Sequence, residues 1–133
     1  MRASETDRLV RAARQARRRA VARQSGFRVG AALAARDGRV FTGCNVENAT
    51  LGLTVCAERV ALLKALSEGA RAFKLLVVAA GPVNPTPPCG ACRQLLWEYC
   101  GDIPVVMVNP RRITARHTLA ELLPLPFDRR LLE

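Results

Sequence analysis

The stretch KLLVVAAGPVNPTPPCGAC, residues 74–92, joins an apolar run, a proline-rich loop and a Cys-x-x-Cys motif. Residues 74–80 have the continuous apolar pattern of a strand that helices cover on both faces. The four prolines that follow exclude regular structure, and the next helix is predicted over residues 90–99. Cys89 and Cys92 therefore open a helix that follows a buried strand.

The segments on either side extend this alternation of strands and helices. In chain order they are predicted as a helix from Ser4 to near Gly26, strand-like runs at 27–35 and 40–45, a helix over 55–68, a buried strand at 103–108 and a short helix over 119–123. Asp37-Gly38 joins the first two runs as a tight β-hairpin, because this dipeptide accepts positive φ. The order of elements predicts an α/β fold, a three-layer α/β/α sandwich.

Length and composition predict one cytoplasmic domain. The 133 residues match a single domain, 1–133, with an ordinary core. No apolar run approaches the roughly 20 residues of a membrane span, and the N-terminus lacks the apolar part of a signal peptide. Five cysteines are an odd count, which favours reduced thiols that bind metal over a disulfide framework. No membrane partner is expected.

The net charge of +10 raises the alternative of a nucleic-acid partner. The densest arginine cluster falls within the first predicted helix, between Arg11 and Arg23. Such a run is usually the solvated face of a helix. Net charge bears on association and solubility and not on chemistry, so a nucleic-acid partner is not the expectation, and polynucleotide binding is kept as an alternative.

Three cysteines and one glutamate form a candidate catalytic zinc site. Zinc held by three protein ligands, here Cys56, Cys89 and Cys92, keeps one coordination position open. Glu58 lies two residues from the first of them. A ligand-x-Glu element followed by Pro-Cys-x-x-Cys is the pattern of zinc nucleobase deaminases, in which the glutamate is the general acid/base. We expect one Zn²⁺ per chain, a water or hydroxide as fourth ligand, and hydrolytic deamination.

The charge of such a site requires an offset. Three thiolates and Zn²⁺ sum to −1, which makes the metal a weaker Lewis acid than one held by three neutral histidines. Arg59 is the nearest cation in the sequence that could hydrogen-bond a ligating sulfur and withdraw charge from it. We therefore expect Arg59 to tune the charge of the zinc site.

Two other interpretations of the cysteines remain open. A thioredoxin-like redox motif also places Cys-x-x-Cys at a helix start, but it gives Cys56 and Glu58 no role. A structural four-cysteine zinc site would need Cys44 or Cys100 as the fourth ligand. Cys100 lies about two helical turns, or roughly 12 Å, beyond the motif. His117, the only histidine, is predicted to lie on the surface.

At this point the sequence resembles the small, homotetrameric-type cytidine deaminases. The blocks that carry the resemblance, in the order of that family, are Phe27-Arg28-Val29-Gly30-Ala31-Ala32-Leu33, Asn45-Val46-Glu47-Asn48-Ala49, Thr54-Val55-Cys56-Ala57-Glu58-Arg59-Val60-Ala61 and Pro88-Cys89-Gly90-Ala91-Cys92-Arg93-Gln94. The resemblance implies a mixed sheet of about five strands, the three cysteines as zinc ligands, and free cytidine or deoxycytidine as substrate in pyrimidine salvage. It also implies a homotetramer with sites at subunit interfaces.

The resemblance further implies a set of substrate-binding residues. Asn45 and Glu47 would hydrogen-bond the ribose 3′-hydroxyl, and two residues that are two apart on a strand do face the same way. Phe27 and Ala57 resemble pocket residues of the family. Phe127 resembles the C-terminal aromatic residue that stacks on the base.

Three segments differ from the family pattern. The tyrosine common before the Phe27 block is absent, because the chain reads Arg23-Gln24-Ser25 there. Leu51 occupies a neighbourhood in which the family frequently has an aromatic residue. Residues 109–118 are arginine-rich and lack the usual signal for a last hairpin. Another aminopyrimidine, such as an antibiotic or a modified nucleoside, therefore remains the alternative substrate.

Overall fold

Five strands form one mixed sheet in the order β2-β1-β3-β4-β5. Only the neighbouring strands β3 and β4 run parallel, and the other three pairs are antiparallel. The computed structural model describes residues 4–81 and 85–133. Its elements, in chain order, are helix α1 (Glu5–Arg17), strands β1 (Gly30–Ala35) and β2 (Val40–Cys44), the 3₁₀ turn η1 (Leu51–Leu53), helix α2 (Ala57–Ser67), strand β3 (Phe73–Ala79), helix α3 (Gly90–Cys100), strands β4 (Pro104–Val108) and β5 (Ile113–Thr118), helix α4 (Leu119–Leu122) and the 3₁₀ turn η2 (Arg129–Leu132).

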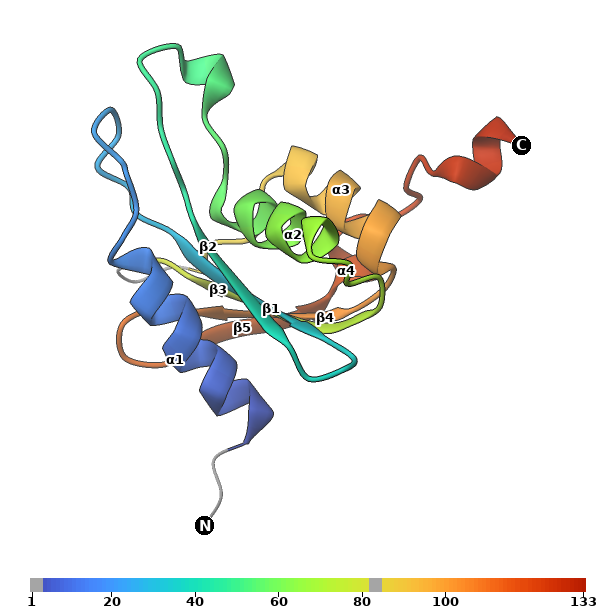
Figure 1. The fold of residues 1–133 in the computed structure, drawn as a ribbon, viewed down its shortest axis with the longest axis horizontal. Helices are drawn as coiled ribbons and strands as arrows, with labels where there is room; N and C mark the ends of the chain where they lie inside the picture. Colours follow the sequence, from blue (N-terminus) through green and yellow to red (C-terminus); the bar gives the residue numbers. More distant parts are fainter. Residues whose placement is uncertain (1–3, 82–84) are drawn as a thin grey trace.

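Helices cover both faces of this sheet. Helix α1 lies on one face, and α2 and α3 lie on the other (Figure 1). All six residues of β1 are buried. Ala31 and Leu33 pack towards α2 and α3, whereas Ala32 and Ala34 pack towards α1, as the two-residue period of a strand requires. The predicted three-layer α/β/α sandwich is confirmed.

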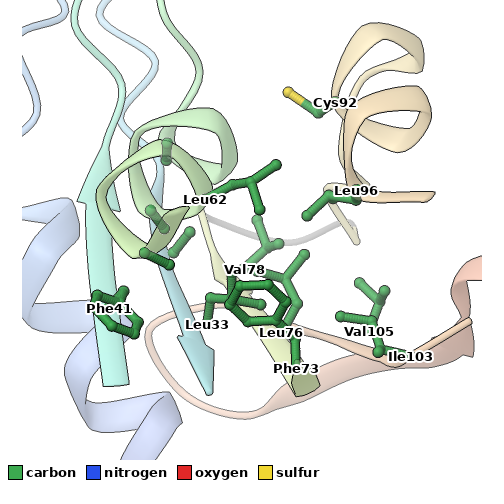
Figure 2. Close-up of a cluster of buried hydrophobic side chains, with 14 of the residues drawn as sticks. Leu33, Phe41, Leu62, Phe73, Leu76, Val78, Cys92, Leu96, Ile103 and Val105 are labelled. Carbon is green, nitrogen blue, oxygen red and sulfur yellow. The ribbon is translucent and has the colours of Figure 1, made fainter. Parts of the chain in front are cut away.

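The larger apolar cluster lies between the sheet and helices α2 and α3 (Figure 2). Leu62 of α2 and Leu96 of α3 pack with Leu76 and Val78 of β3, and all four are at most 1% exposed. Burial of one such side chain contributes roughly 1.5–3 kcal/mol. Cys92 lies at the edge of the same cluster, so the packing that holds α3 on the sheet also fixes one candidate metal ligand.

Helix α1 ends at Arg17, well before the predicted end near Gly26. Beyond it, Val21 pairs like a strand with the segment after β2: its N–H donates to the Asn45 carbonyl (2.9 Å) and its carbonyl accepts from the Glu47 N–H (2.8 Å). These tertiary hydrogen bonds replace the helical ones that the apolar spacing suggested. The prediction for residues 18–26 was therefore wrong.

Strand β5 forms in the arginine-rich segment that carries no hairpin signal. It pairs antiparallel with β4, and its residues are half-buried or exposed, as is common for an edge strand with charged side chains. The turn before it depends on Asn109, whose Oδ1 accepts from the N–H groups of Arg111 (2.8 Å) and Arg112 (2.9 Å). A side chain that caps its own turn in this way explains how the chain reverses there.

The described helices are short. The longest, α1, has 13 residues. Within residues 4–81 and 85–133, no helix has the length and apolar character needed to cross a membrane.

Strand β2 and helix α2 are in close contact at Gly43. A Cβ atom at this position would lie 2.4 Å from the Ala57 carbonyl oxygen and 2.6 Å from the Ala61 nitrogen. Both are backbone atoms of α2, so they cannot rotate away as a side chain could. The absence of a side chain at Gly43 thus sets the distance of α2, and of Glu58 on it, from the sheet.

We expect Gly43→Ala to destabilise the fold by about 1–3 kcal/mol, because overpacking against rigid backbone moves α2. The measurement is the free energy of unfolding in urea. Gly52→Ala is the matched control: a Cβ there meets nothing within 4 Å, so a change below about 0.5 kcal/mol is expected. Equal unfolding free energies for the two variants would contradict the proposed contact.

Candidate metal centre and active-site pocket

Helices α2 and α3 both begin at a cysteine. Cys56 is the N-cap residue of α2 and Cys89 that of α3, and both have extended backbones and make no side-chain capping hydrogen bond. Their sulfurs are free for other use and lie at the positive ends of the helix dipoles, which stabilises an anion by about 0.3–1 kcal/mol. Cys92, in the first turn of α3, is fully buried.

The three sulfurs converge on one point. The Sγ atom of Cys89 lies 3.8 Å from that of Cys56 and 3.5 Å from that of Cys92, and all three lie within 4.8 Å of one another. Tetrahedral zinc with Zn–S bonds of about 2.3 Å requires sulfurs about 3.8 Å apart. The three cysteines therefore fit one zinc ion. Across residues 4–81 and 85–133, no fourth cysteine, histidine or carboxylate joins the group.

Glu58 lies beside this group on the wall of a cavity of about 180 Å³. Its side chain is buried, with only 5% of the residue exposed. Burial raises the pKa of Glu58 to about 7, and the negative charge of Cys56 acts in the same direction. A carboxyl group with a pKa near 7 can both accept and donate a proton at neutral pH.

Arg59 contacts the first of the three cysteines. Its Nη2 donates to the Thr54 carbonyl oxygen at 3.0 Å and lies 3.8 Å from the Cys56 Sγ. Hydrogen bonding from Cys92, supported by Arg59, holds the pKa of the Cys56 thiol well below its usual range. The Arg59 Nε is buried and has no hydrogen-bond partner in the described part of the chain. The guanidinium thus lies where it can offset thiolate charge.

Three of the five predicted substrate-binding residues line the cavity: Phe27, Asn45 and Ala57. Asn45 is buried and holds the segment before β1 in place. Its Oδ1 accepts from the Val29 N–H, and its Nδ2 donates to the Phe27 carbonyl, both at 2.8 Å. Asn45 therefore positions the backbone that carries Phe27 at the mouth of the cavity.

Glu47 is not among the residues that line this cavity. Its carboxylate accepts from the N–H groups of Gln24 and Ser25, both at 2.9 Å, and from the Ser25 hydroxyl. The Ser25 hydroxyl is the main reason that the pKa of Glu47 lies below its ordinary value. In the isolated chain, Glu47 thus fixes the turn at which the family tyrosine is missing.

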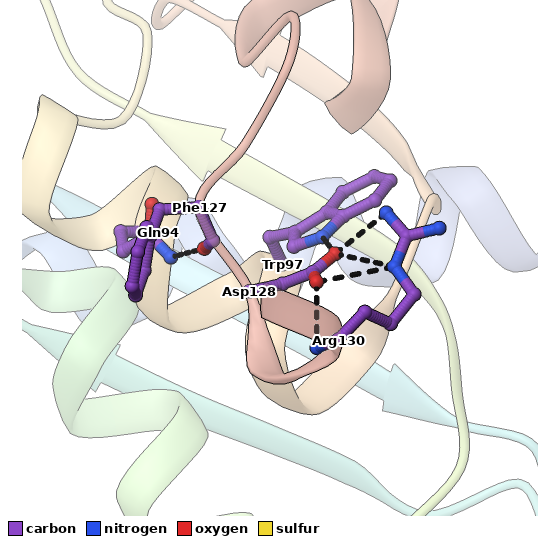
Figure 3. Close-up of polar contacts among 5 residues, drawn as sticks. All are labelled: Gln94, Trp97, Phe127, Asp128 and Arg130. Carbon is purple, nitrogen blue, oxygen red and sulfur yellow. Dashed lines mark hydrogen bonds and ion pairs between the residues drawn. The ribbon is translucent and has the colours of Figure 1, made fainter. Parts of the chain in front are cut away.

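Phe127 also lies outside the cavity, on the C-terminal segment, and is 60% exposed. Helix α3 holds this segment through two side chains (Figure 3). Gln94 donates to the Phe127 carbonyl, and the Trp97 Nε1 donates to Asp128 at 3.2 Å. Asp128 also pairs with Arg130 at 2.8 Å, and these contacts lower the pKa of Asp128 to about 2.

Trp97 is the only tryptophan of the chain, so its fluorescence reports on this attachment. We expect Asp128→Ala to shift the emission of Trp97 to longer wavelength, because loss of the acceptor exposes the indole to water. Arg129→Ala is the control, since Arg129 is exposed and its 4.0 Å pair with Glu98 should contribute little. Superimposable spectra of Asp128→Ala and the unsubstituted protein would mean that other contacts hold the segment.

Several residues of the site have weak sequence signals. Thr86 and Pro87 line the cavity, although the proline-rich loop gave no reason to select them beyond their place before Cys89. Ser25 contacts Glu47 from 22 residues away, and Trp97 contacts Asp128 from 31 residues away. Such contacts depend on the folded chain and not on a local pattern.

The fold and the three-cysteine centre define a zinc-binding α/β protein with a buried carboxyl group beside its metal site. The family model described as "Cytidine and deoxycytidylate deaminase zinc-binding region" matches residues 3–108. The chain belongs to this family of deaminases, and its membership bears out the resemblance seen in the sequence.

Individual relatives agree with this assignment. A cytidine deaminase of Sporosarcina psychrophila is 44% identical over 126 residues, which cover 94% of this chain and 93% of that protein. The crystal structure of cytidine deaminase from Burkholderia pseudomallei superimposes with a TM-score of 0.88 at 43% identity, covering 94% of this chain and 100% of the other. A blasticidin-S deaminase of Bacillus cereus is more distant, at 30% identity over 109 residues, 76% of this chain and 77% of that protein.

Proposed function

We propose that this protein is a zinc-dependent hydrolase that converts free cytidine, deoxycytidine or both into the uridine form and ammonia. The observation that carries the proposal is a cavity lined by Cys56, Cys89 and the buried carboxyl group of Glu58, with the third sulfur, that of the buried Cys92, within 4.8 Å of the other two. The similarity to cytidine deaminases along nearly the whole chain supports the choice of substrate.

In the proposed mechanism Cys56, Cys89 and Cys92 hold the metal and Glu58 moves the protons. Bound zinc is a Lewis acid that lowers the pKa of a water molecule and so makes it a nucleophile at neutral pH. Glu58 takes a proton from the attacking water and delivers it to the ring nitrogen beside the amine-bearing carbon. Attack of the water oxygen forms a C–O bond at that carbon. Glu58 then takes the proton that remains on the added oxygen and delivers it to the exocyclic amine, so that the carbonyl forms, the C–N bond breaks and ammonia leaves. The balance is one water consumed and one ammonia released per turnover.

Recognition of the substrate is assigned to the walls of the cavity and the segments beside it. Phe27 and Ala57 would contact the nucleoside, and Asn45 with Glu47 would bond the ribose 3′-hydroxyl. The Asn45 amide is already fixed by two backbone partners, which supports a rigid binding wall. Glu47 would act from its present position, since its oxygens keep lone pairs beyond the three bonds they accept. Phe127 would stack on the base of the nucleoside substrate.

The active form is proposed to be a homotetramer. The cavity of one chain has a volume of about 180 Å³, whereas pockets that bind small molecules usually have at least roughly 300 Å³. Neighbouring subunits would therefore supply further walls of the pocket. Large apolar side chains near the cavity and on the C-terminal segment are exposed, as an interface would require: Phe27, Leu51, Leu53 and Phe127. Sedimentation equilibrium that returns a monomer at micromolar concentration would contradict this assembly.

A cytoplasmic role in pyrimidine salvage completes the proposal. All five cysteines are free thiols in the structure. Thiolate zinc ligands suit a reducing compartment, where disulfides are rare.

The test of function is ammonia release from cytidine, deoxycytidine, adenosine and blasticidin S, each supplied separately. Turnover of the cytosine nucleosides, abolished when a strong zinc chelator is present during refolding, is the expected result. Turnover of blasticidin S alone would support the second candidate, a deaminase of an aminopyrimidine antibiotic, which the 30% identical relative favours. No turnover of any compound by protein that holds one zinc per chain would refute both.

We expect Arg59→Gln to lower zinc affinity or activity by about 10- to 100-fold, the range found when groups that support metal ligands are removed. The cause is loss of the cation 3.8 Å from the Cys56 sulfur. Zinc affinity in a competitive chelator titration and kcat are the readouts. Arg36→Gln removes the same charge from an exposed turn and should change neither zinc affinity nor kcat. An equal loss in Arg36→Gln and Arg59→Gln would mean that only the overall charge of the protein matters.

A further inference from the structure

A second cavity, of about 140 Å³, lies on the face of the sheet that α1 covers. Its walls are the end of α1, with Arg14, Arg17 and the C-cap residue Arg18, and the chain at the ends of β3 and β4, with Ala80 and Asn109. Figure 1 shows α1 on the opposite side of the sheet from α2 and α3, which carry the metal centre. This cavity is therefore separate from the proposed active site.

Two of the three arginines are held in place by backbone carbonyls. The Arg14 Nε donates to the Asn109 carbonyl at 3.1 Å, and the Arg17 Nε donates to the Arg28 carbonyl at 3.0 Å. Both residues are half-buried. Because each guanidinium uses its Nε for anchoring, its terminal nitrogens remain as donors in a fixed orientation. Part of the entropy cost of ordering these side chains is thus met by the fold.

The backbone of α1 is also fixed at this point. A Cβ atom on Gly30 would lie 2.1 Å from the Ala13 carbonyl oxygen and 2.4 Å from the Arg17 nitrogen. Strand β1 and the last turn of α1 are thus in direct backbone contact. The arginines project from a rigid platform and not from a frayed helix end.

The cavity concentrates donors and positive charge without a counter-ion. No carboxylate lines it, and within residues 4–81 and 85–133 none of its three arginines forms an ion pair. The Asn109 Oδ1 already accepts from two backbone N–H groups, which leaves its Nδ2 as a donor. Three guanidinium groups around one small space repel one another, and a bound anion would offset that repulsion.

We propose that this arginine cavity, formed by Arg14, Arg17, Arg18 and Asn109, binds a phosphate group. Guanidinium groups match phosphate oxygens in paired hydrogen bonds, which favours phosphate over a halide. Pockets that hold whole small molecules have volumes of roughly 300 Å³ or more, so this cavity is too small for a whole nucleotide. The ligand is therefore inorganic phosphate or one phosphate group of a nucleotide whose remainder lies outside the cavity.

Isothermal titration calorimetry of the zinc-loaded protein tests the proposal, with inorganic phosphate, pyrophosphate and uridine 5′-triphosphate as separate probes. Ionic strength is held constant with chloride, because screening alone changes the binding of anions. Saturable binding of at least one probe is expected. Preference for inorganic phosphate or for the nucleotide would identify which source of the phosphate group the cavity accepts, and both results support the site.

Two variants with the same net charge provide the control. Arg14→Gln with Arg18→Gln removes two charges from the cavity and should weaken binding by at least about 10-fold, as expected for loss of charge-assisted hydrogen bonds. Arg8→Gln with Arg11→Gln removes two charges from exposed positions of the same helix and should bind as the unsubstituted protein does. Arg18→Glu, at an exposed position with no anchoring role, tests the site if loss of Arg14 disturbs folding.

Three outcomes would overturn the proposal. The first is no saturable heat with any probe at constant ionic strength. The second is equal weakening in both double variants, which would reduce the effect to overall charge. The third is salt-dependent binding of a single-stranded oligonucleotide that persists in the cavity variants and is lost in the variant with Arg8→Gln and Arg11→Gln. That result would assign the basic face of the helix to nucleic acid binding instead.

Discussion

Glu58→Gln should lower kcat for cytidine by about 10²–10⁴-fold, the contribution typical of a positioned general acid/base. The amide keeps the size of the buried side chain but cannot exchange the proton that the reaction must move twice. The zinc content should stay at one per chain, because the three sulfurs converge without help from Glu58. Steady-state kinetics and metal analysis of the same preparation provide the two measurements.

Glu68→Gln is the matched control for this substitution. Glu68 is exposed at the C-terminal end of the same helix, α2, far along it from the metal centre. It should keep full activity. If Glu58→Gln kept its rate with zinc bound, another group would have to move the protons and the proposed mechanism would be wrong.

Cys92→Ser should remove zinc from the protein and lower its activity by more than about 10²-fold. Loss of a group that only supports a metal ligand costs about 10- to 100-fold, and loss of the ligand itself should cost more. Cys92 is fully buried and lies 3.5 Å from the Cys89 sulfur. The hydroxyl is a poor substitute for a thiolate, and metal binding of this kind also stabilises the fold. A lower melting temperature is therefore expected beside the lower zinc content.

Cys100→Ala, at the other end of the same helix, separates ligation from thiol loss in general. Burial raises the pKa of Cys100 to about 12, so this residue stays a neutral thiol and does not compete for zinc. Its substitution should leave one zinc per chain and full activity. Retention of zinc by Cys92→Ser, with circular dichroism unchanged, would show that two sulfurs and another ligand suffice.

The metal centre and the arginine cavity both involve the chain that leaves β3. The metal centre draws its thiols from the starts of α2 and α3, whereas the arginine cavity places three arginines from the end of α1 against the residues that follow β3 and β4. The chain that leaves β3 runs from Ala80 at the arginine cavity to Cys89 at the metal centre. At the arginine cavity, Ala80 follows β3 and Asn109 follows β4, and the carboxyl ends of these two parallel strands meet at the same edge of the sheet.

Much of the fold was predictable because its signals are local. The apolar run at 74–80 became β3, the Asp37-Gly38 hairpin formed as expected, and the Cys-x-x-Cys motif opened α3. In each case the pattern acts within a few residues and does not depend on the rest of the chain. The end of α1 failed because Val21 pairs with residues 45–47, a distant partner that no local pattern reveals.

The sequence by itself determined the layered α/β class, the family and the set of groups with metal and acid/base chemistry. These follow from residue types and spacings, which are properties of the chain. Only the tertiary structure decided that three sulfurs from two helices meet within 4.8 Å, and that burial raises the pKa of Glu58 to about 7. It alone tied Glu47 to the turn at Ser25 and formed an anion-sized cavity between the arginines at the end of α1 and the residues that follow β3 and β4. Distances and desolvation arise when remote segments pack together, so neither can be read from order along the chain.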